Sequence, residues 1–131
     1  MTPAKAIHTS AAPTPVGPYS QAVVYEGLVY SSGQIAIDPA TDALIVGDIE
    51  AQAEQVFANL RAVLEAAGSS LDNVVRVSVY LTDLSLFPRV NAIYERHLGS
   101  DPKPARSTIG VAALPLGAQL EIDLIATLGP C

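Results

Sequence analysis

The sequence is poor in charged residues, which make up 15% of its 131 residues. Soluble domains average about 25%. Because charged side chains mostly cover surface, the shortage indicates that some apolar surface is buried between subunits. We therefore expect an oligomer; a large, loosely packed core is the alternative.

Basic residues are also scarce. Seven Lys and Arg stand against thirteen Asp and Glu, giving a net charge of −6, and the seven are scattered along the chain. A domain that binds RNA or DNA usually carries clustered basic residues. The composition therefore argues against nucleic acid as a partner.

Cysteine and histidine are too few for disulfide or metal chemistry. The single cysteine, Cys131, cannot form an internal disulfide, and we expect it to be incidental. His8 and His97 lie far apart without a further ligand at metal-binding spacing, so we expect surface or packing roles and no metal site. The glycine-rich motifs of nucleotide-binding sites are absent as well.

Long apolar runs are missing too. No stretch reaches the 18 or so apolar residues of a membrane span, and the polar and proline residues between Thr9 and Pro15 interrupt any signal-peptide core. We therefore expect no membrane association and a cytoplasmic location.

The residues that are present predict one domain over residues 1–131. Apolar residues at steps of three and four predict a helix over 48–67, with Asp48 as N-cap and Gly68 as the stop. Its polar face is expected to be solvated; that face holds Glu50, Gln52, Glu54, Asn59, Arg61 and Glu65. A second helix is expected over 89–98, after a turn at 84–87.

Alternating and β-branched segments predict the strands. They lie at 6–8, 22–25, 28–32, 74–81, 106–111 and 120–127, with a short extended piece at 43–46. Glu26-Gly27 reads as a hairpin turn, and Val75, Val77, Val79 and Leu81 as one apolar face. The order of these elements predicts an α+β fold with both helices packed on one face of the sheet.

Two charged residues lie on strands that we expect to be mostly buried. These are Arg106, at the head of one strand, and Glu121, on the outer face of the last. Buried charges need partners, so the two could form an interface ion pair. Alternatively, Arg106 binds a substrate carboxylate through its planar fork and Glu121 handles a water molecule.

Four blocks of sequence resemble the RidA (YjgF/YER057c/UK114) family. The longest is PARSTIGVAALPLGAQLEI at 104–122; the others are GPYSQA at 17–22, SGQI at 32–35 and VNAIY at 90–94. Their order and spacing fit the family from about residue 6 to residue 127. The resemblance implies a chorismate-mutase-like mixed sheet with two helices on one face, and a homotrimer with clefts between subunits.

The resemblance also implies an activity without metal or organic cofactor. Family members hydrolyse reactive 2-imino and enamine acids such as 2-aminoacrylate, releasing 2-keto acids and ammonia. By position, Arg106 would bind the substrate carboxylate and Glu121 would position the attacking water. The other residues expected to line the site are Tyr19, Ser32, Gly33 and Asn91.

Thr108 departs from the pattern, because many family members carry cysteine two residues after the arginine. By alternation Thr108 shares a strand face with Arg106 and should still line the site. The change leaves other functions open. They are a pathway-specific deaminase acting on 2-aminomuconate or a pyrimidine-degradation intermediate, and a keto-acid-binding trimer without turnover. The acidic net charge counts against the family's older ribonuclease label.

Overall fold

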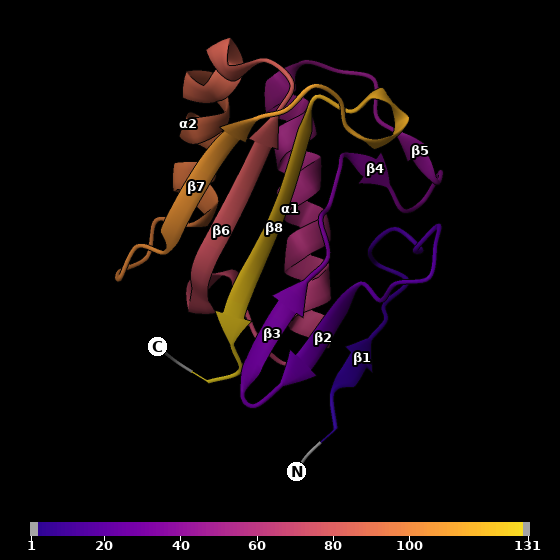
Figure 1. The fold of residues 1–131 in the computed structure, drawn as a ribbon, viewed down its shortest axis with the longest axis vertical. Coiled ribbons are helices and arrows are strands. Elements are labelled where there is room, and N and C mark those ends of the chain that lie inside the picture. The colour runs from indigo at the N-terminus through magenta and orange to yellow at the C-terminus, as the bar shows by residue number, and fades with distance from the viewer. Residues whose placement is uncertain (1–2, 130–131) are drawn as a thin grey trace.

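The computed structural model describes residues 3–129, so Cys131 lies outside the described residues. Two helices, α1 and α2, accompany a six-stranded sheet and a two-stranded one (Figure 1). The strands of the large sheet are β1 (Lys5–Ile7), β2 (Ala22–Tyr25), β3 (Leu28–Ser31), β6 (Val74–Leu81), β7 (Ala105–Gly110) and β8 (Leu120–Thr127). The small sheet pairs β4 (Ile37–Asp38) with β5 (Ala43–Leu44), and the helices are α1 (Ile49–Ala66) and α2 (Phe87–His97).

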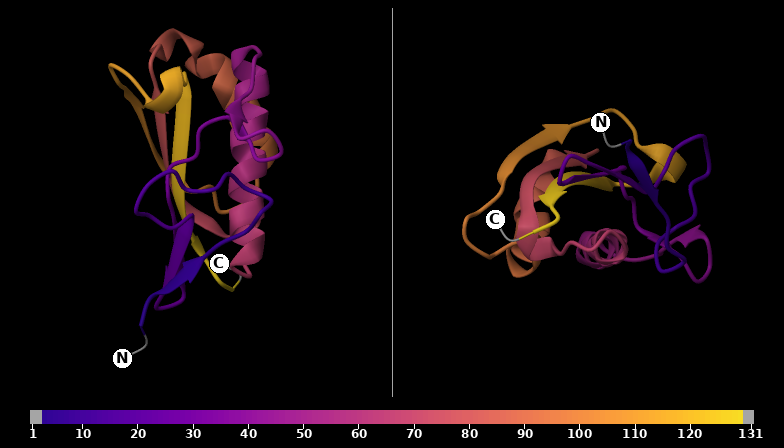
Figure 2. Two further views of the ribbon diagram at one scale, coloured as in Figure 1. Left: turned by 90° about the vertical axis from the view of Figure 1, so that its right-hand side faces the viewer. Right: turned by 90° about the horizontal axis from the view of Figure 1, so that it is seen from below.

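The large sheet is mixed. Its order is β1-β2-β3-β8-β6-β7, with β6 and β7 parallel and the other neighbours antiparallel. Both helices cover one face of the sheet and leave the other face open (Figure 2). This arrangement confirms the predicted α+β fold with two helices on one face.

The core lies between the sheet and the two helices. Val77, Val79 and Leu81 of β6 and Ile122 and Leu124 of β8 are at most 1% exposed. Alternate residues of the same strands project from the open face. The two faces thus carry different chemistry.

Helix α1 begins and ends where the sequence predicts. The Asp48 side chain accepts a hydrogen bond from the Ala51 amide at 2.8 Å, and Gly68 adopts a φ of 85°. The expectation that the polar face is solvated is wrong for Gln52 and Asn59, which are buried. They bond loop groups instead: the Asn59 amide donates to the carbonyls of Ile35 and Ile37 at 3.2 and 2.9 Å.

The β2–β3 turn is also as predicted. Glu26 and Gly27 have φ values of 52° and 79°, as a two-residue turn of type I′ requires. In β6 the predicted apolar face is wrong at its first residue. A register shift between Val74 and Arg76 puts Val74 in the core and leaves Val75 37% exposed, because the bulge interrupts the alternation.

The second helix starts earlier than expected. A 3-10 turn spans Leu84–Leu86 and α2 begins at Phe87, with Pro88 in its first turn, where the missing amide costs no helical hydrogen bond. Phe87 is therefore helical rather than part of a turn. No helix among residues 3–129 combines the length and the apolar composition needed to cross a membrane.

Candidate active site

Arg106 projects from an edge strand toward the helices. It lies opposite Val77 in the β6–β7 register, and opposed residues share a face, so its side chain is on the same side as the core. Because β7 has no further strand beside it, Arg106 is exposed. The expectation of a mostly buried strand is wrong here.

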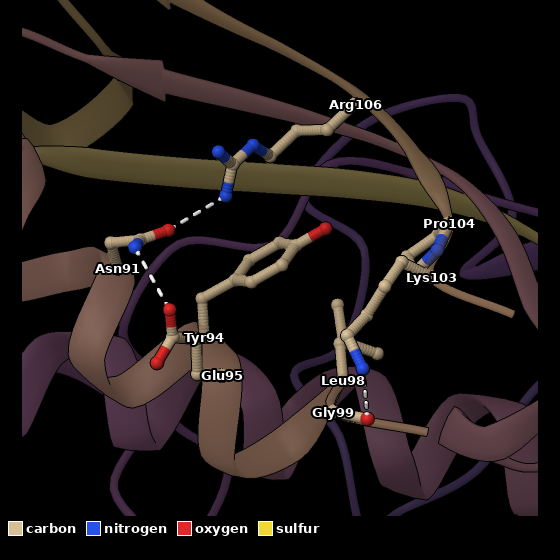
Figure 3. Close-up of a pocket in the computed structure, with 8 residues that line it drawn as sticks. All are labelled: Asn91, Tyr94, Glu95, Leu98, Gly99, Lys103, Pro104 and Arg106. Carbon is tan, nitrogen blue, oxygen red and sulfur yellow. Dashed lines mark hydrogen bonds between the residues drawn. The ribbon is translucent and has the colours of Figure 1, made fainter. Parts of the chain in front are cut away.

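Three residues of α2 hold the Arg106 guanidinium. Its central carbon lies 4.9 Å from the centre of the Phe87 ring and 4.7 Å from that of the Tyr94 ring. Its Nη1 donates to Asn91 Oδ1 at 2.7 Å (Figure 3). Positions 87, 91 and 94 form one stripe of a helix. A guanidinium held between two rings keeps a fixed plane.

Asn91 is itself oriented by a neighbour. Its amide nitrogen donates to Glu95 Oε1 at 3.4 Å, which turns its oxygen toward Arg106 (Figure 3). Asn91 uses one of the five guanidinium N–H donors. The arrangement can bind a carboxylate through charge-assisted hydrogen bonds, worth about 1.5–3 kcal/mol net.

A cavity of about 580 Å³ opens beside Arg106, between α2 and the segment that precedes β7. Tyr94 forms part of its wall, and burial raises the pKa of this phenol against an opposing effect of Arg106. Lys103 lies farther along the wall, where its Nζ donates to the Gly99 carbonyl at 2.5 Å. The cavity therefore has one polar end at Asn91 and Arg106 and another at Lys103.

The other expected site residues form a second cluster. Tyr19, Ser32, Gly33 and Glu121 line one cavity of about 450 Å³. Its remaining wall is largely apolar and includes Val16, Ile35, Ile37 and Leu116. This cavity can therefore hold a small molecule with a polar end at Glu121.

Buried polar residues hold the loops around this second cavity. Gln21 is 2% exposed, and its Nε2 lies 3.0, 3.3 and 2.9 Å from the carbonyls of Thr9, Ala12 and Pro13. Ser32 Oγ donates to the Ser20 carbonyl at 2.5 Å. These bonds fix the loop that carries Tyr19 against the end of β3.

Gly33 lies against the Glu121 carboxylate. The Gln34 amide donates to the Ile122 carbonyl at 2.9 Å and the Ile122 amide donates back at 3.1 Å, so the loop is pinned beside β8. A Cβ at position 33 would lie 2.8 Å from Glu121 Cδ. Glycine at position 33 therefore leaves room for the Glu121 carboxylate.

Glu121 lies in an unusual electrostatic setting for a carboxylate. Burial raises its pKa, and the charge of Asp123 raises it further. Asp123 accepts a hydrogen bond from Tyr80 Oη at 3.1 Å. Glu121 is therefore more easily protonated than an exposed glutamate.

The two clusters lie on opposite faces of the sheet. Glu121 is opposite Tyr80 in the β6–β8 register, on the open face, whereas Arg106 faces the helices. Among residues 3–129 no ion pair joins the two. Thr108 lies two residues beyond Arg106 on its face and is not among the residues that line either cavity.

Sequence reasoning overlooked the aromatic support of Arg106 and the polar support of the loops. Tyr94 was not among the expected site residues, and Phe87 was placed in a turn. The signal for both was the spacing of 87, 91 and 94 on one helical stripe. Tyr80 and Asp123 are the neighbours of Glu121. Their position follows from the β6–β8 register, which a single sequence does not supply.

Comparisons with known proteins agree with this architecture. A family model described as Endoribonuclease L-PSP matches residues 9–128. Protein DfrA of Myxococcus xanthus is 51% identical over 124 residues, covering 93% of this chain and 94% of that one. A protein of Dermatophagoides farinae named 2-iminobutanoate/2-iminopropanoate deaminase is 42% identical over 128 residues, covering 98% and 99%.

Solved structures give the same result. RidA from the Antarctic bacterium Psychrobacter sp. superposes with a TM-score of 0.89 at 50% identity, covering 94% of this chain and 98% of that one. A Rid-family protein from Yersinia pestis reaches 0.93 at 43% identity, covering 95% and 99%. The chain therefore belongs to the RidA (YjgF/YER057c/UK114) family, to which the endoribonuclease L-PSP model corresponds.

Proposed function

We propose that this protein hydrolyses reactive 2-imino and enamine acids to 2-keto acids and ammonia. The observation that carries the proposal is the pairing of two complementary clusters. One presents the Arg106 guanidinium in a fixed plane beside a cavity. The other presents the half-buried Glu121 carboxyl in a mostly apolar cavity. A small imino acid needs both, a cation for its carboxylate and an acid beside its reacting carbon.

A homotrimer would bring the clusters together. Within one chain they lie on opposite faces of the sheet, so one molecule of substrate cannot touch both. The open face also carries exposed apolar side chains, Tyr30 at 41% and Ile109 at 45%, which supports contact with a second copy. We place each site between two subunits, with Arg106 from one and Glu121 from its neighbour.

The chemistry follows from this placement. The substrate binds as the imine, with its carboxylate on Arg106. A water molecule beside Glu121 adds through its oxygen to the imine carbon and gives a carbinolamine. The C–N bond then breaks, ammonia leaves and the 2-keto acid remains. Orientation together with general acid–base assistance, about 10²–10⁴-fold for the latter, accounts for catalysis of this step.

The test is ammonia and pyruvate release from 2-aminoacrylate that serine dehydratase generates in place. We expect the wild type to accelerate release. Arg106→Ala should lower kcat/KM by about 10- to 150-fold, because it removes a charge-assisted contact of about 1.5–3 kcal/mol. Arg96→Ala is the matched control, since Arg96 is an exposed arginine of α2 that does not line the cavity.

Three results would contradict the proposal or a part of it. If the wild type does not accelerate release while it binds 2-oxobutanoate stably, the protein is a keto-acid-binding module. If Arg106→Ala and Arg96→Ala act alike, Arg106 does not bind the substrate. Glu121→Gln with full turnover and unchanged affinity would remove Glu121 from the mechanism.

A further inference from the structure

The open face of the sheet gathers a phenol and a second carboxylate around Glu121. Residues 121 and 123 alternate with core residues of β8, so both project from this face. Tyr80 lies directly opposite Glu121 in the β6–β8 register and its hydroxyl donates to Asp123 Oδ2 at 3.1 Å. The Tyr80 side chain therefore starts opposite Glu121 and extends diagonally to Asp123, the next residue of β8 on the same face.

The hydrogen bond shows which residue is the donor in this group. Tyr80 donates its hydroxyl hydrogen to Asp123 Oδ2. Burial raises the pKa of the Tyr80 phenol, and the nearby carboxylates of Asp123 and Glu121 add to the rise. Tyr80 thus keeps the proton that it donates.

Glu121 is also shifted toward its protonated form. Burial raises its pKa first, and the charge of Asp123 raises it further. A like charge nearby disfavours the charged form of a carboxyl group. The Asp123 carboxylate on the same face of β8 therefore favours the protonated form of Glu121.

Within its own chain, Glu121 has no cation among the described residues that line its cavity; in the proposed trimer, the neighbouring subunit's Arg106 is the cation that faces it across the site. The loop before β2 contributes Tyr19, and the described residues that line the cavity include no Lys, Arg or His. Arg76 also projects from the open face of β6, but its guanidinium donates to Ser107 of β7 at 2.7 Å, on the side of β6 away from β8. Within the chain, the charge that acts on Glu121 is therefore that of Asp123.

We propose that Asp123 and Tyr80 keep a proton on Glu121, and that Glu121 gives this proton to the imine nitrogen during hydrolysis. The proposal deepens the proposed function and rests on it. Glu121 then carries protons in both halves of the reaction, while Asp123 and Tyr80 are positioning residues that touch no substrate.

The proton balance closes in two steps. Water oxygen bonds to the imine carbon, the C=N electron pair moves to nitrogen, nitrogen takes the Glu121 proton, and the water returns one proton to Glu121. In the second step the Glu121 proton passes to nitrogen as the C–N bond breaks toward it. The hydroxyl forms the C=O bond and returns its proton to Glu121. Imine and water thus become keto acid and ammonia, with Glu121 unchanged.

The first measurement is a titration of Glu121 in the intact protein. Carboxyl-labelled glutamate gives one ¹³C signal for each of the six glutamates, and Glu121→Gln identifies the relevant one. Asp123→Asn keeps the shape of the side chain and an acceptor for Tyr80 but removes the charge. We expect it to move the Glu121 titration midpoint to lower pH. Tyr80→Phe should move the midpoint in the same direction, because the Asp123 carboxylate then loses the hydrogen bond that holds it in place on this face.

The control variant removes a carboxylate elsewhere. Asp42 is exposed in the turn between β4 and β5, with a φ of 55° that asparagine also accepts. Asp42→Asn should leave the Glu121 midpoint where it is. A midpoint that Asp123→Asn does not move beyond this control overturns the proposal, whether or not the wild type is active.

The second measurement is the pH profile of kcat/KM with 2-aminoacrylate. Because the protonated form of Glu121 is the active one, activity should fall as pH rises through its midpoint. In Asp123→Asn, the part of the profile where activity falls with rising pH (the alkaline limb) should move to lower pH by the same amount as the ¹³C midpoint. A ¹³C shift without a matching shift of the limb overturns the role of Glu121 as proton carrier. A wild type without deaminase activity overturns the proposed function instead, and the titration still decides the effect of Asp123 on Glu121.

Discussion

The Glu121 carboxylate fills the space in which a side chain at position 33 would begin. A Cβ there would lie 2.8 Å from Glu121 Cδ and 3.1 Å from its Cγ, closer than atoms in real contact approach. Gly33 does not adopt a positive φ, so its backbone accepts other residues. The requirement for glycine is therefore a matter of the site and not of the fold.

Gly33→Ala tests this requirement. The methyl group should push the carboxylate out of place and lower kcat by about 10- to 100-fold, a partial loss of the roughly 10²–10⁴-fold that general acid–base catalysis contributes. The melting temperature should change little. Gly129→Ala, with open space around the added methyl, is the control. Full kcat in Gly33→Ala would mean that the position of the Glu121 carboxylate is not needed for turnover.

At the scale of single residues, the sequence predicts which residues belong to the site better than it predicts what they contact. Arg106 and Asn91 were both expected in the site, and the structure joins them at 2.7 Å. The two rings that hold Arg106 could be found only from the helical spacing of 87, 91 and 94. The burial of Gln52 and Asn59 was missed because polar residues on a helix usually face water. Each has a partner far away in sequence, the Gln119 side chain for Gln52 and the Ile35 carbonyl for Asn59.

At the scale of elements, apolar periodicity predicts the helices and strands that bury one regular face against the core. Helix α1 and strand β8 match their predicted positions to within one residue at each end, because each buries one regular face. The prediction failed at the bulge of β6 and at the start of α2, where a single residue breaks the period. Periodicity also cannot tell which strand lies at the edge, so the exposure of Arg106 was not foreseen.

Ion pairs across α1 and α2 make the packing of these helices depend on pH. Arg89 bonds both oxygens of Glu50 at 2.8 and 2.6 Å, and these bonds lower the pKa of Glu50. The His97 hydrogen bond at 2.5 Å likewise lowers the pKa of Glu54. Both folded-state values lie below the ordinary 4.5. The stabilisation is therefore complete above about pH 4.5 and is lost as pH falls through the folded-state values.

We expect the melting temperature of the wild type to fall in this acid range at fixed protein concentration. The double variant Glu50→Gln/Glu54→Gln should start lower at neutral pH and lose less on acidification, since it has no such carboxylates to protonate. Glu65→Gln, an exposed substitution on the same helix, should follow the wild type. Equal acid slopes in the double variant and the wild type would contradict a role for these pairs in stability. The effect should be small because both glutamates are partly exposed.

At the scale of the whole molecule, the open face of the sheet explains the shortage of charge in the sequence. That face bears Tyr30, Val75 and Ile109, each more than a third exposed, alongside the polar group around Glu121. A second copy placed on this face would cover the apolar side chains and complete the site. The composition predicts association, but it does not predict which two clusters would meet across the interface.

Mixed assemblies test this division of the site between subunits. In the proposed trimer, a subunit with Arg106→Ala lacks the arginine half of a site, and a subunit with Glu121→Gln lacks the glutamate half, so each variant alone should have no intact site. If a site takes Arg106 from one subunit and Glu121 from the next, every trimer that contains both variants holds one intact site, by the symmetry of a closed ring. Random assembly from equal amounts should restore about a quarter of the wild-type sites.

The experiment compares co-refolded variants with the same two proteins mixed after folding, by rate of pyruvate release per subunit. Light scattering checks that each preparation is a trimer. Recovery only after co-refolding would show that subunits share sites, because folded trimers that do not exchange cannot combine their halves. A rate that stays at the level of the single variants would place Arg106 and Glu121 of one chain in the same site, and the opposite orientation of their side chains across the sheet argues against that arrangement.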